Sequence, residues 1–157
     1  MARHRIYGLF DPSKKEIFYI GQTSYIPYYR LLNHICASKD HLFPVSLRIK
    51  EMVSNGIKPK VFTLKEFEIN LCRLTNKNHG LFFENIFIKE YSSLGTLLNI
   101  VGNPLYDRKT KIFKEPNLRK ELKFVDGKYY IDSDAIKYLH QEPYNPFKNE
   151  RFLSKIR

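Results

Sequence analysis

The sequence predicts a small α/β (α+β) domain: a central antiparallel sheet of three strands flanked by helices, with a short C-terminal appendage made of a hairpin and a helix. Three observations predict this class. Two runs rich in Ile, Tyr and Phe flank a turn-forming segment, two proline-initiated stretches carry apolar residues at helical spacing, and a further strand-like run precedes a strongly apolar helix. At 157 residues the chain is long enough to bury a hydrophobic core without disulfides.

The strands come first. Residues 3–10 and 16–21 are predicted to form an N-terminal β-hairpin, because residues 11–15 between them, Asp-Pro-Ser-Lys-Lys, favour a tight reversal. Residues 60–69 alternate loosely between apolar and polar types and are rich in strand formers. They are expected to form the third strand.

Helices are predicted over residues 27–37 and about 44–54, because Pro27 suits a first helical turn and Asn55-Gly56 a helix end. A third helix over residues 78–91 has too many apolar groups for a surface helix, so it should lie across the sheet. The apolar positions expected to pack are Leu31, Leu32 and Ile35, then Leu47, Ile49, Met52 and Val53, then Leu81, Phe82, Phe83, Ile86, Phe87 and Ile88.

The chain is expected to divide into a core over residues 1–102 and a basic appendage over 103–157. Residues 97–100 are short and apolar, as in a packed segment, and Gly102-Asn103-Pro104 interrupts the chain. In the appendage, residues 124–131 carry Asp-Gly at a hairpin turn, and residues 132–141 suit one short helix capped by Ser133.

The formal net charge of +11 and the pI near 9.6 predict an anionic partner. DNA, RNA and anionic lipid share that chemistry. Lipid fits least, because the basic residues are scattered over turns and strands and do not line one helix face. No stretch is apolar enough to span a membrane, and no secretory signal is expected at the N-terminus.

Cys36 and Cys72 lie in apolar surroundings without a CxxC pair or a nearby zinc-ligand spacing. We expect two buried, reduced thiols. Such cysteines are typical of a reducing, cytoplasmic compartment.

Two short motifs occupy the predicted hairpin: Ile6-Tyr7-Gly8, and Tyr19-Ile20-Gly21 after it, with eleven residues between the tyrosines. Polar residues follow in a set order: Gln22-Thr23, Arg30-Leu31, His34, Glu84 and Leu97-Leu98-Asn99. Any one of these would ordinarily be a core, surface or capping residue. Together, over residues 3–102, they resemble the GIY-YIG nucleases in order and spacing.

The resemblance implies how phosphodiester hydrolysis would be divided among these residues. Tyr7 would be the general base that activates water, with Tyr19 beside it and His34 positioning or sharing the proton. A free tyrosine has a pKa near 10, so it needs a nearby cation to ionise at neutral pH. Arg30 would favour the phenolate and contact the scissile phosphate.

By the same resemblance, Glu84 would be the single protein ligand of Mg²⁺ or Mn²⁺, since magnesium at phosphate substrates keeps most of its waters. Asn99 would support the site through hydrogen bonds. The chain departs from the family at Arg5, where the first motif normally begins with Gly. Arg5 therefore either points away from the site or adds a phosphate contact.

Residues expected to touch DNA outside this set are Arg5, His41, Lys109, Lys111, Lys114 and Arg119. His41 is open between a substrate contact and a plain surface residue. The basic residues of the appendage are open between a DNA-holding surface and a solvated face.

The function expected from the sequence is a metal-dependent endonuclease that acts on double-stranded DNA as a monomer or homodimer. The alternatives are a non-catalytic nucleic-acid-binding protein of the same fold and a structural protein that packs beside nucleic acid. The choice among a restriction-type, a homing-type and a structure-selective enzyme stays open, because the core is common to all three.

Overall fold

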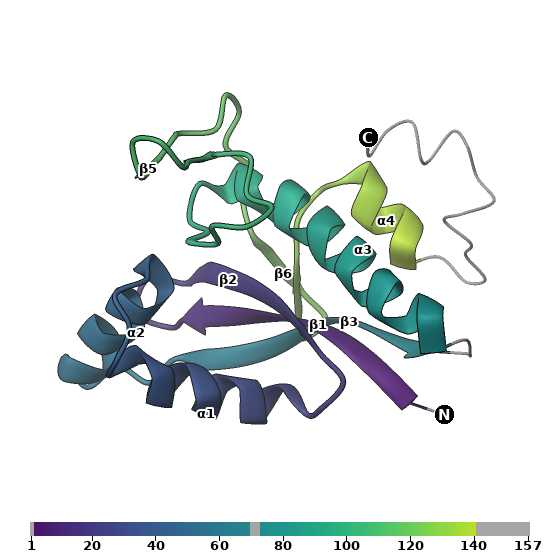
Figure 1. Cartoon of the computed structure of the whole chain (residues 1–157). Helices are drawn as coiled ribbons and strands as arrows, with labels where there is room; N and C mark the ends of the chain where they lie inside the picture. The colour runs from purple at the N-terminus through teal and green to yellow at the C-terminus, as the bar shows by residue number, and fades with distance from the viewer. Residues whose placement is uncertain (1, 70–72, 141–157) are drawn as a thin grey trace.

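The computed structural model describes residues 2–69 and 73–140 (Figure 1). Strands β1 (Ala2–Asp11), β2 (Glu16–Thr23) and β3 (Lys60–Ile69) form an antiparallel sheet in the order β2-β1-β3. This confirms the predicted fold class. With β1 in the centre, β2 and β3 are the two edges.

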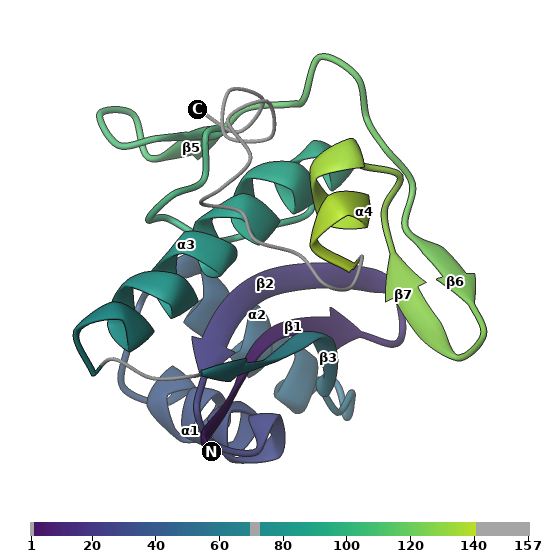
Figure 2. The same cartoon turned by 90° about the vertical axis from the view of Figure 1, so that its right-hand side faces the viewer.

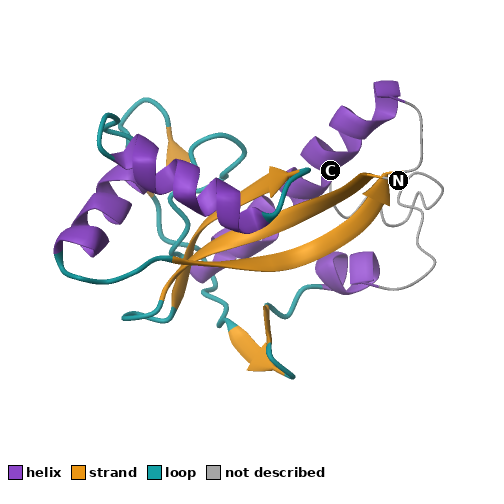
Figure 3. Cartoon of the chain, turned by 90° about the horizontal axis from the view of Figure 1, so that it is seen from below, coloured by secondary structure: helices purple, strands orange, loops and turns teal. Residues whose placement is uncertain are grey.

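Helices cover both faces of the sheet. Below it in Figure 1 lies α1 (Pro27–Ser38), which packs against α2 (Pro44–Ser54), and Figure 3 shows this side of the sheet from below. Above it lies α3 (Arg73–Tyr91), which continues into the short 3-10 helix η1 (Ser92–Leu94). Both α1 and α2 begin at a proline in the first turn, as predicted.

The sheet separates two apolar clusters. On the α3 side, Ile6 and Phe10 of β1 pack with Phe83 and Phe87, and on the α1 side Tyr7 and other β1 and β2 residues pack with the helices. Alternate strand residues face opposite sides, so one strand supplies both clusters. The α1-side members are Tyr7, Leu9, Phe18, Leu31, Ile49 and Met52.

Some expected core positions face solvent. Each of the three helices packs through one face only, so the apolar residues beside that face stay uncovered. These residues are Leu32, Leu47, Val53 and Leu81, each at least 40% exposed. Cys36 is also exposed, so its expected burial was wrong, and Cys72 lies outside the described residues.

An ion pair fastens the β1–β2 turn to α2. The carboxylate of Asp11 accepts hydrogen bonds from the backbone of Ser13 at 2.8 Å and from Arg48 of α2 at 2.9 Å. Arg48 also contacts Glu16 at 3.2 Å. Burial of Asp11 opposes its ionisation, but these hydrogen bonds bring its pKa down to about 2.

The described part of the segment after residue 102 packs onto the core. Two short hairpins, β4 (Tyr106–Asp107) with β5 (Ile112–Phe113) and β6 (Lys123–Val125) with β7 (Lys128–Tyr130), precede α4 (Asp134–His140). Helix α4 packs on α3, and β7 lies against β3 (Figure 2). The buried side chains of this segment join the α3-side cluster: Ile131, Ala135, Ile136 and Leu139.

Two details of this segment were predicted. Asp126 and Gly127 form the β6–β7 turn, both with left-handed backbone, and the backbone N–H of Ile136 donates to Ser133 Oγ at 3.3 Å at the start of α4. The β4–β5 hairpin was not predicted, because strands of two residues leave no alternating pattern. It is stabilised by Asp107, which accepts from the backbone of Lys109 at 2.9 Å.

No helix in the described ranges is long and apolar enough to cross a membrane.

Ile136 tests whether α4 is part of the core. We expect Ile136→Ala to lower the free energy of unfolding by about 2–5 kcal/mol, the usual range for truncating a buried Ile, because the side chain is 2% exposed. Urea unfolding followed by circular dichroism measures this. Ile112→Ala is the matched control, since Ile112 is 60% exposed and should cost little. Equal stabilities for the two variants would show that α4 is not integral to the core.

Candidate active site

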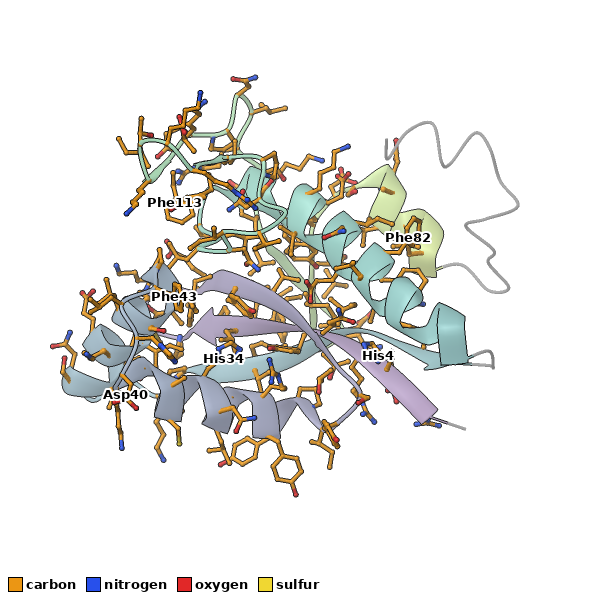
Figure 4. The ribbon with its side chains drawn as sticks, viewed as in Figure 1. His4, His34, Asp40, Phe43, Phe82 and Phe113 are labelled. Carbon is orange, nitrogen blue, oxygen red and sulfur yellow. The ribbon has the colours of Figure 1, made fainter. Side chains whose placement is uncertain are left out.

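The β-hairpin and α1 bring Tyr7, Tyr19 and His34 together. The Tyr7 hydroxyl oxygen lies 3.0 Å from Nε2 of His34, which lies between α1 and the sheet (Figure 4). The Tyr19 ring centroid is 4.8 Å from the His34 ring and 6.3 Å from the Tyr7 ring. From the sequence only the order of these three residues along the chain was known, and the structure shows that they form one cluster in space.

Gly21 makes room for this cluster. It is paired with Tyr7 across β1 and β2, and a Cβ atom at position 21 would overlap the Tyr7 ring and hydroxyl. The glycine of the second motif is thus required by the tyrosine of the first.

Arg30 and Glu84 complete the cluster from two different helices. Arg30, one turn before His34 on α1, is close enough to Tyr7 and Glu84 to act on their pKa values. The Glu84 carboxylate accepts a hydrogen bond from the backbone of Gln22. Because β2 is an edge strand, a side chain from α3 can reach the groups on the α1 side of the sheet near the C-terminal end of β2.

Asn99 holds β2 from its outer edge. Its Oδ1 accepts from the backbone N–H of Ile20 at 2.9 Å, and its Nδ2 donates to the Ile20 carbonyl at 2.8 Å. The backbone N–H of Leu98 donates to the Phe18 carbonyl at 2.8 Å. These bonds fix the backbone of the residue between Tyr19 and Gly21.

Sequence reasoning missed a contact beside the cluster. Nε2 of His4 and Oε1 of Gln22 are 2.8 Å apart, and a Cβ at position 80 would overlap Gln22. The signal was present, since a glycine inside an otherwise apolar helix often marks close approach of another segment. His4 lies near the other end of β1 from the β1–β2 turn (Figure 4).

Burial controls the protonation of Tyr7, Tyr19 and His34. Burial, and after it Arg30, lowers the pKa of His34 to about 4. Burial raises the pKa of Tyr7 although Arg30 opposes this, and burial, then Tyr7 and Glu84, raises that of Tyr19. The expected phenolate-favouring effect of Arg30 is thus outweighed. At neutral pH both tyrosines are protonated and His34 is neutral, so the Tyr7 hydroxyl can donate to His34 Nε2.

The cluster is accessible through four of its five members. Tyr7 has no exposed surface, whereas Tyr19, Arg30, His34 and Glu84 are each partly exposed. Water and substrate therefore meet these four side chains first and reach Tyr7 only when its neighbours move. Nε of Arg30 is buried without a hydrogen-bond partner in the described structure, so the guanidinium has unused donor capacity.

Glu84 suits a divalent cation. Burial raises its pKa, and Arg30 and the Gln22 backbone only oppose that rise, so its negative charge is incompletely compensated. Among the described residues, no three His, Cys, Asp or Glu side chains are grouped to hold a metal ion. A magnesium ion held by one carboxylate and water needs no such group.

The residues predicted to contact DNA lie around the cluster and beyond it. Arg5 is two residues before Tyr7, where it contacts Glu66 at 3.4 Å and donates to the Tyr25 carbonyl at 3.1 Å. His41 is exposed, and its ring lies 5.6 Å from that of Phe43.

The predicted contacts of the appendage belong to a different region. Lys109, Lys111 and Lys114 are exposed on or beside the β4–β5 hairpin, whose Phe113 lies away from His34 in Figure 4. Arg119 pairs with Glu115 at 2.6 Å. The structure does not bring these four basic residues to Tyr7.

Searches of family models, curated proteins and solved structures found no match to this chain.

The lowered pKa of His34 predicts a pH-dependent loss of stability. In the unfolded chain His34 regains a pKa near 6.5, so between about pH 6.5 and 4 the unfolded state binds the proton more strongly. Stability should therefore fall as the pH falls through this window, by up to about 1 kcal/mol per pH unit.

His34→Gln should show a shallower fall, because glutamine does not titrate but can still accept from Tyr7. Tm values measured from pH 7.5 to 4.5 for both proteins isolate the histidine, since Glu84 and the other carboxylates are common to them. Parallel pH profiles would contradict the burial of a neutral His34.

Proposed function

We propose that this protein is a metal-dependent endonuclease of the GIY-YIG type that hydrolyses DNA phosphodiester bonds by direct attack of water. One observation carries the proposal: five side chains that lie up to 77 positions apart in the sequence meet in one cluster around the Tyr7 hydroxyl. They are Tyr7, Tyr19, Arg30, His34 and Glu84. A nuclease needs such a set, because it must accept a proton, neutralise a phosphate and assist the leaving oxygen.

In the proposed reaction Tyr7 and His34 act as a proton relay. The Tyr7 oxygen takes a proton from the attacking water while its own phenolic proton passes to Nε2 of His34 across the 3.0 Å contact. Water becomes the nucleophile and His34 becomes an imidazolium. This relay needs no phenolate beforehand, which agrees with the raised pKa of Tyr7.

Arg30 and Glu84 would neutralise the negative charge of the scissile phosphate and the leaving oxygen, Arg30 directly and Glu84 through a bound metal ion. The guanidinium of Arg30, whose Nε has no hydrogen-bond partner in the described ranges, would contact a non-bridging oxygen of the scissile phosphate. Glu84 would hold Mg²⁺ or Mn²⁺, which when bound supplies positive charge at the phosphate and the departing 3′ oxygen. Asn99 would keep Tyr19 and Gly21 in place through Ile20.

Double-stranded DNA is the proposed substrate, bound by a monomer or a homodimer. The net charge of +11 supports an anionic partner. Arg5 and His41 would contact DNA near the cluster, and Lys109, Lys111, Lys114 and Arg119 would hold it farther away. A non-catalytic DNA-binding protein is the second candidate, favoured by the complete burial of Tyr7.

Glu84→Gln separates the two candidates. We expect the parent to cut supercoiled plasmid in Mg²⁺ but not in EDTA, and Glu84→Gln to lose cleavage while binding DNA equally well or better, because a negative charge is removed. Gel assays of nicking and linearisation give the rate, and anisotropy gives the affinity. Glu51→Gln is the control, since Glu51 is an exposed carboxylate of α2. Cleavage by Glu84→Gln at the parental rate would refute the metal assignment, and an inactive parent would favour the binding protein.

Tyr7→Phe tests the relay. It removes only the hydroxyl, so the single-turnover rate should fall at least about a hundredfold, the scale expected for losing a general base. DNA affinity should change little. Arg30→Ala should lower the single-turnover rate by a similar factor. It should also make the salt dependence of DNA affinity shallower by up to about one unit of slope, because a phosphate contact is lost. Tyr28→Phe is the control, because Tyr28 is 55% exposed on α1. Full activity in Tyr7→Phe with an inactive His34→Gln would make His34 the immediate base.

A further inference from the structure

A pocket of about 490 Å³ lies on the α3 side of the sheet, apart from the Tyr7 cluster. One wall is α3, and the other is the chain that follows η1 and leads into β4, both above the sheet in Figure 1. Phe82, labelled in Figure 4, is part of the α3 wall. The lining residues are Phe82, Asn85, Ile86, Lys89, Ile100, Gly102, Asn103, Pro104, Tyr106 and Arg108.

The pocket combines an aromatic and aliphatic lining with the exposed side-chain amide of Asn85. The Tyr106 ring is held by Phe113 of β5, with ring centroids 4.8 Å apart. Gly102 has a left-handed backbone (φ 79°) and no Cβ, so Oδ1 of Asn85 can approach it closely. The Asn103 amide, in contrast, is committed to the carbonyls of Leu97 and Asn99.

The charge of the pocket is positive. Lys89 on α3 and Arg108 after β4 are both exposed, and among the described residues no carboxylate lines the pocket. The chain beyond Arg108 adds Lys109, Lys111 and Lys114 on the same hairpin. An apolar, aromatic lining between cations fits a ligand that is flat at one end and anionic at the other.

We propose that this pocket holds one unpaired nucleotide of the DNA substrate. The base would stack on Tyr106 with its edge toward Asn85, and its phosphate would lie toward Arg108 and Lys89. A volume of about 490 Å³ is in the range of small-ligand sites, and stacking on aromatic side chains is how proteins hold bases of unpaired strands. This inference rests on DNA being the substrate, and it identifies the preferred substrate class as DNA with a single-stranded branch or end.

Hydrogen bonds connect the pocket wall to the candidate active site. Asn103 lines the pocket and donates to the Asn99 carbonyl at 2.9 Å, and Asn99 holds Ile20 of β2 between Tyr19 and Gly21. A nucleotide in the pocket would therefore be fixed relative to the Tyr7 cluster through a short, rigid path. The branch would thus determine where the duplex meets the cluster.

The test compares two DNAs in EDTA, where binding is measured without cleavage. One is a blunt duplex, and the other is the same duplex with a short single-stranded extension, each labelled for fluorescence anisotropy. We expect the parent to prefer the extended DNA. Tyr106→Ala should lose about fivefold or more of its affinity for the extended DNA and keep its affinity for the blunt duplex, whereas Tyr106→Phe should behave as the parent.

Arg108→Gln should weaken binding of the extended DNA and make its salt dependence shallower by about 0.7 units of slope, the value for one phosphate on a single strand. Lys58→Gln is the charge-matched control, because Lys58 is exposed in the connection between α2 and β3. Circular dichroism confirms that each variant is folded.

Equal affinity of the parent for both DNAs would overturn the proposal, as would an unchanged preference in Tyr106→Ala. Free thymidine 5′-monophosphate that displaces the extension at comparable concentrations would assign the pocket to a free nucleotide. Cleavage in Mg²⁺ is measured in parallel. Cleavage without a preference for the extended DNA would refute the nucleotide pocket alone. A preference for the extended DNA without cleavage would refute the proposed endonuclease activity alone.

Discussion

The contact between Tyr7 and Gly21 is the constraint on which the candidate site depends. Tyr7 is fully buried in the central strand, and its ring occupies the space that a side chain at position 21 would fill. A buried hydroxyl needs a hydrogen-bond partner, because leaving one unpaired costs about 1–3 kcal/mol. His34 is that partner, so α1 must lie where its second turn meets β1. The position of Arg30, one turn earlier, follows from the same placement.

The second constraint is that β2 is an edge strand. An exposed edge has unpaired backbone groups, and here the side chain of Asn99 and the backbone of Leu98 occupy them at Ile20 and Phe18. The same edge allows Glu84, from the opposite face of the sheet, to reach the backbone of Gln22. A central strand would have kept the two faces apart. The edge therefore joins an α3 carboxylate to an α1 cation.

Burial, more than any charge, determines the protonation of this site. It raises the pKa of Tyr7 and Glu84 and lowers that of His34, in each case disfavouring the charged form. Arg30 keeps its charge, and its buried Nε has no hydrogen-bond partner among the described residues. Two protonated tyrosines and a neutral His34 beside the charged Arg30 suit an anionic substrate. Perturbed groups of this kind gather at functional sites more often than elsewhere.

The sequence by itself determined the three strands of the sheet, the helices and their order, because apolar periodicity, Pro27 and the Asp126-Gly127 turn act over a few residues and leave local patterns. The two-residue strands β4 and β5 leave no such pattern. It also selected residues that the fold brings together, since Tyr7 and Glu84 were chosen by their order along the chain, and their catalytic roles stay predictions. Only the tertiary structure decided the protonation of Tyr7, the space that Gly21 leaves for it, and the packing of the described C-terminal segment on α3. Burial and long-range packing arise from elements far apart in the sequence, so no local pattern predicts how strongly a given side chain is desolvated.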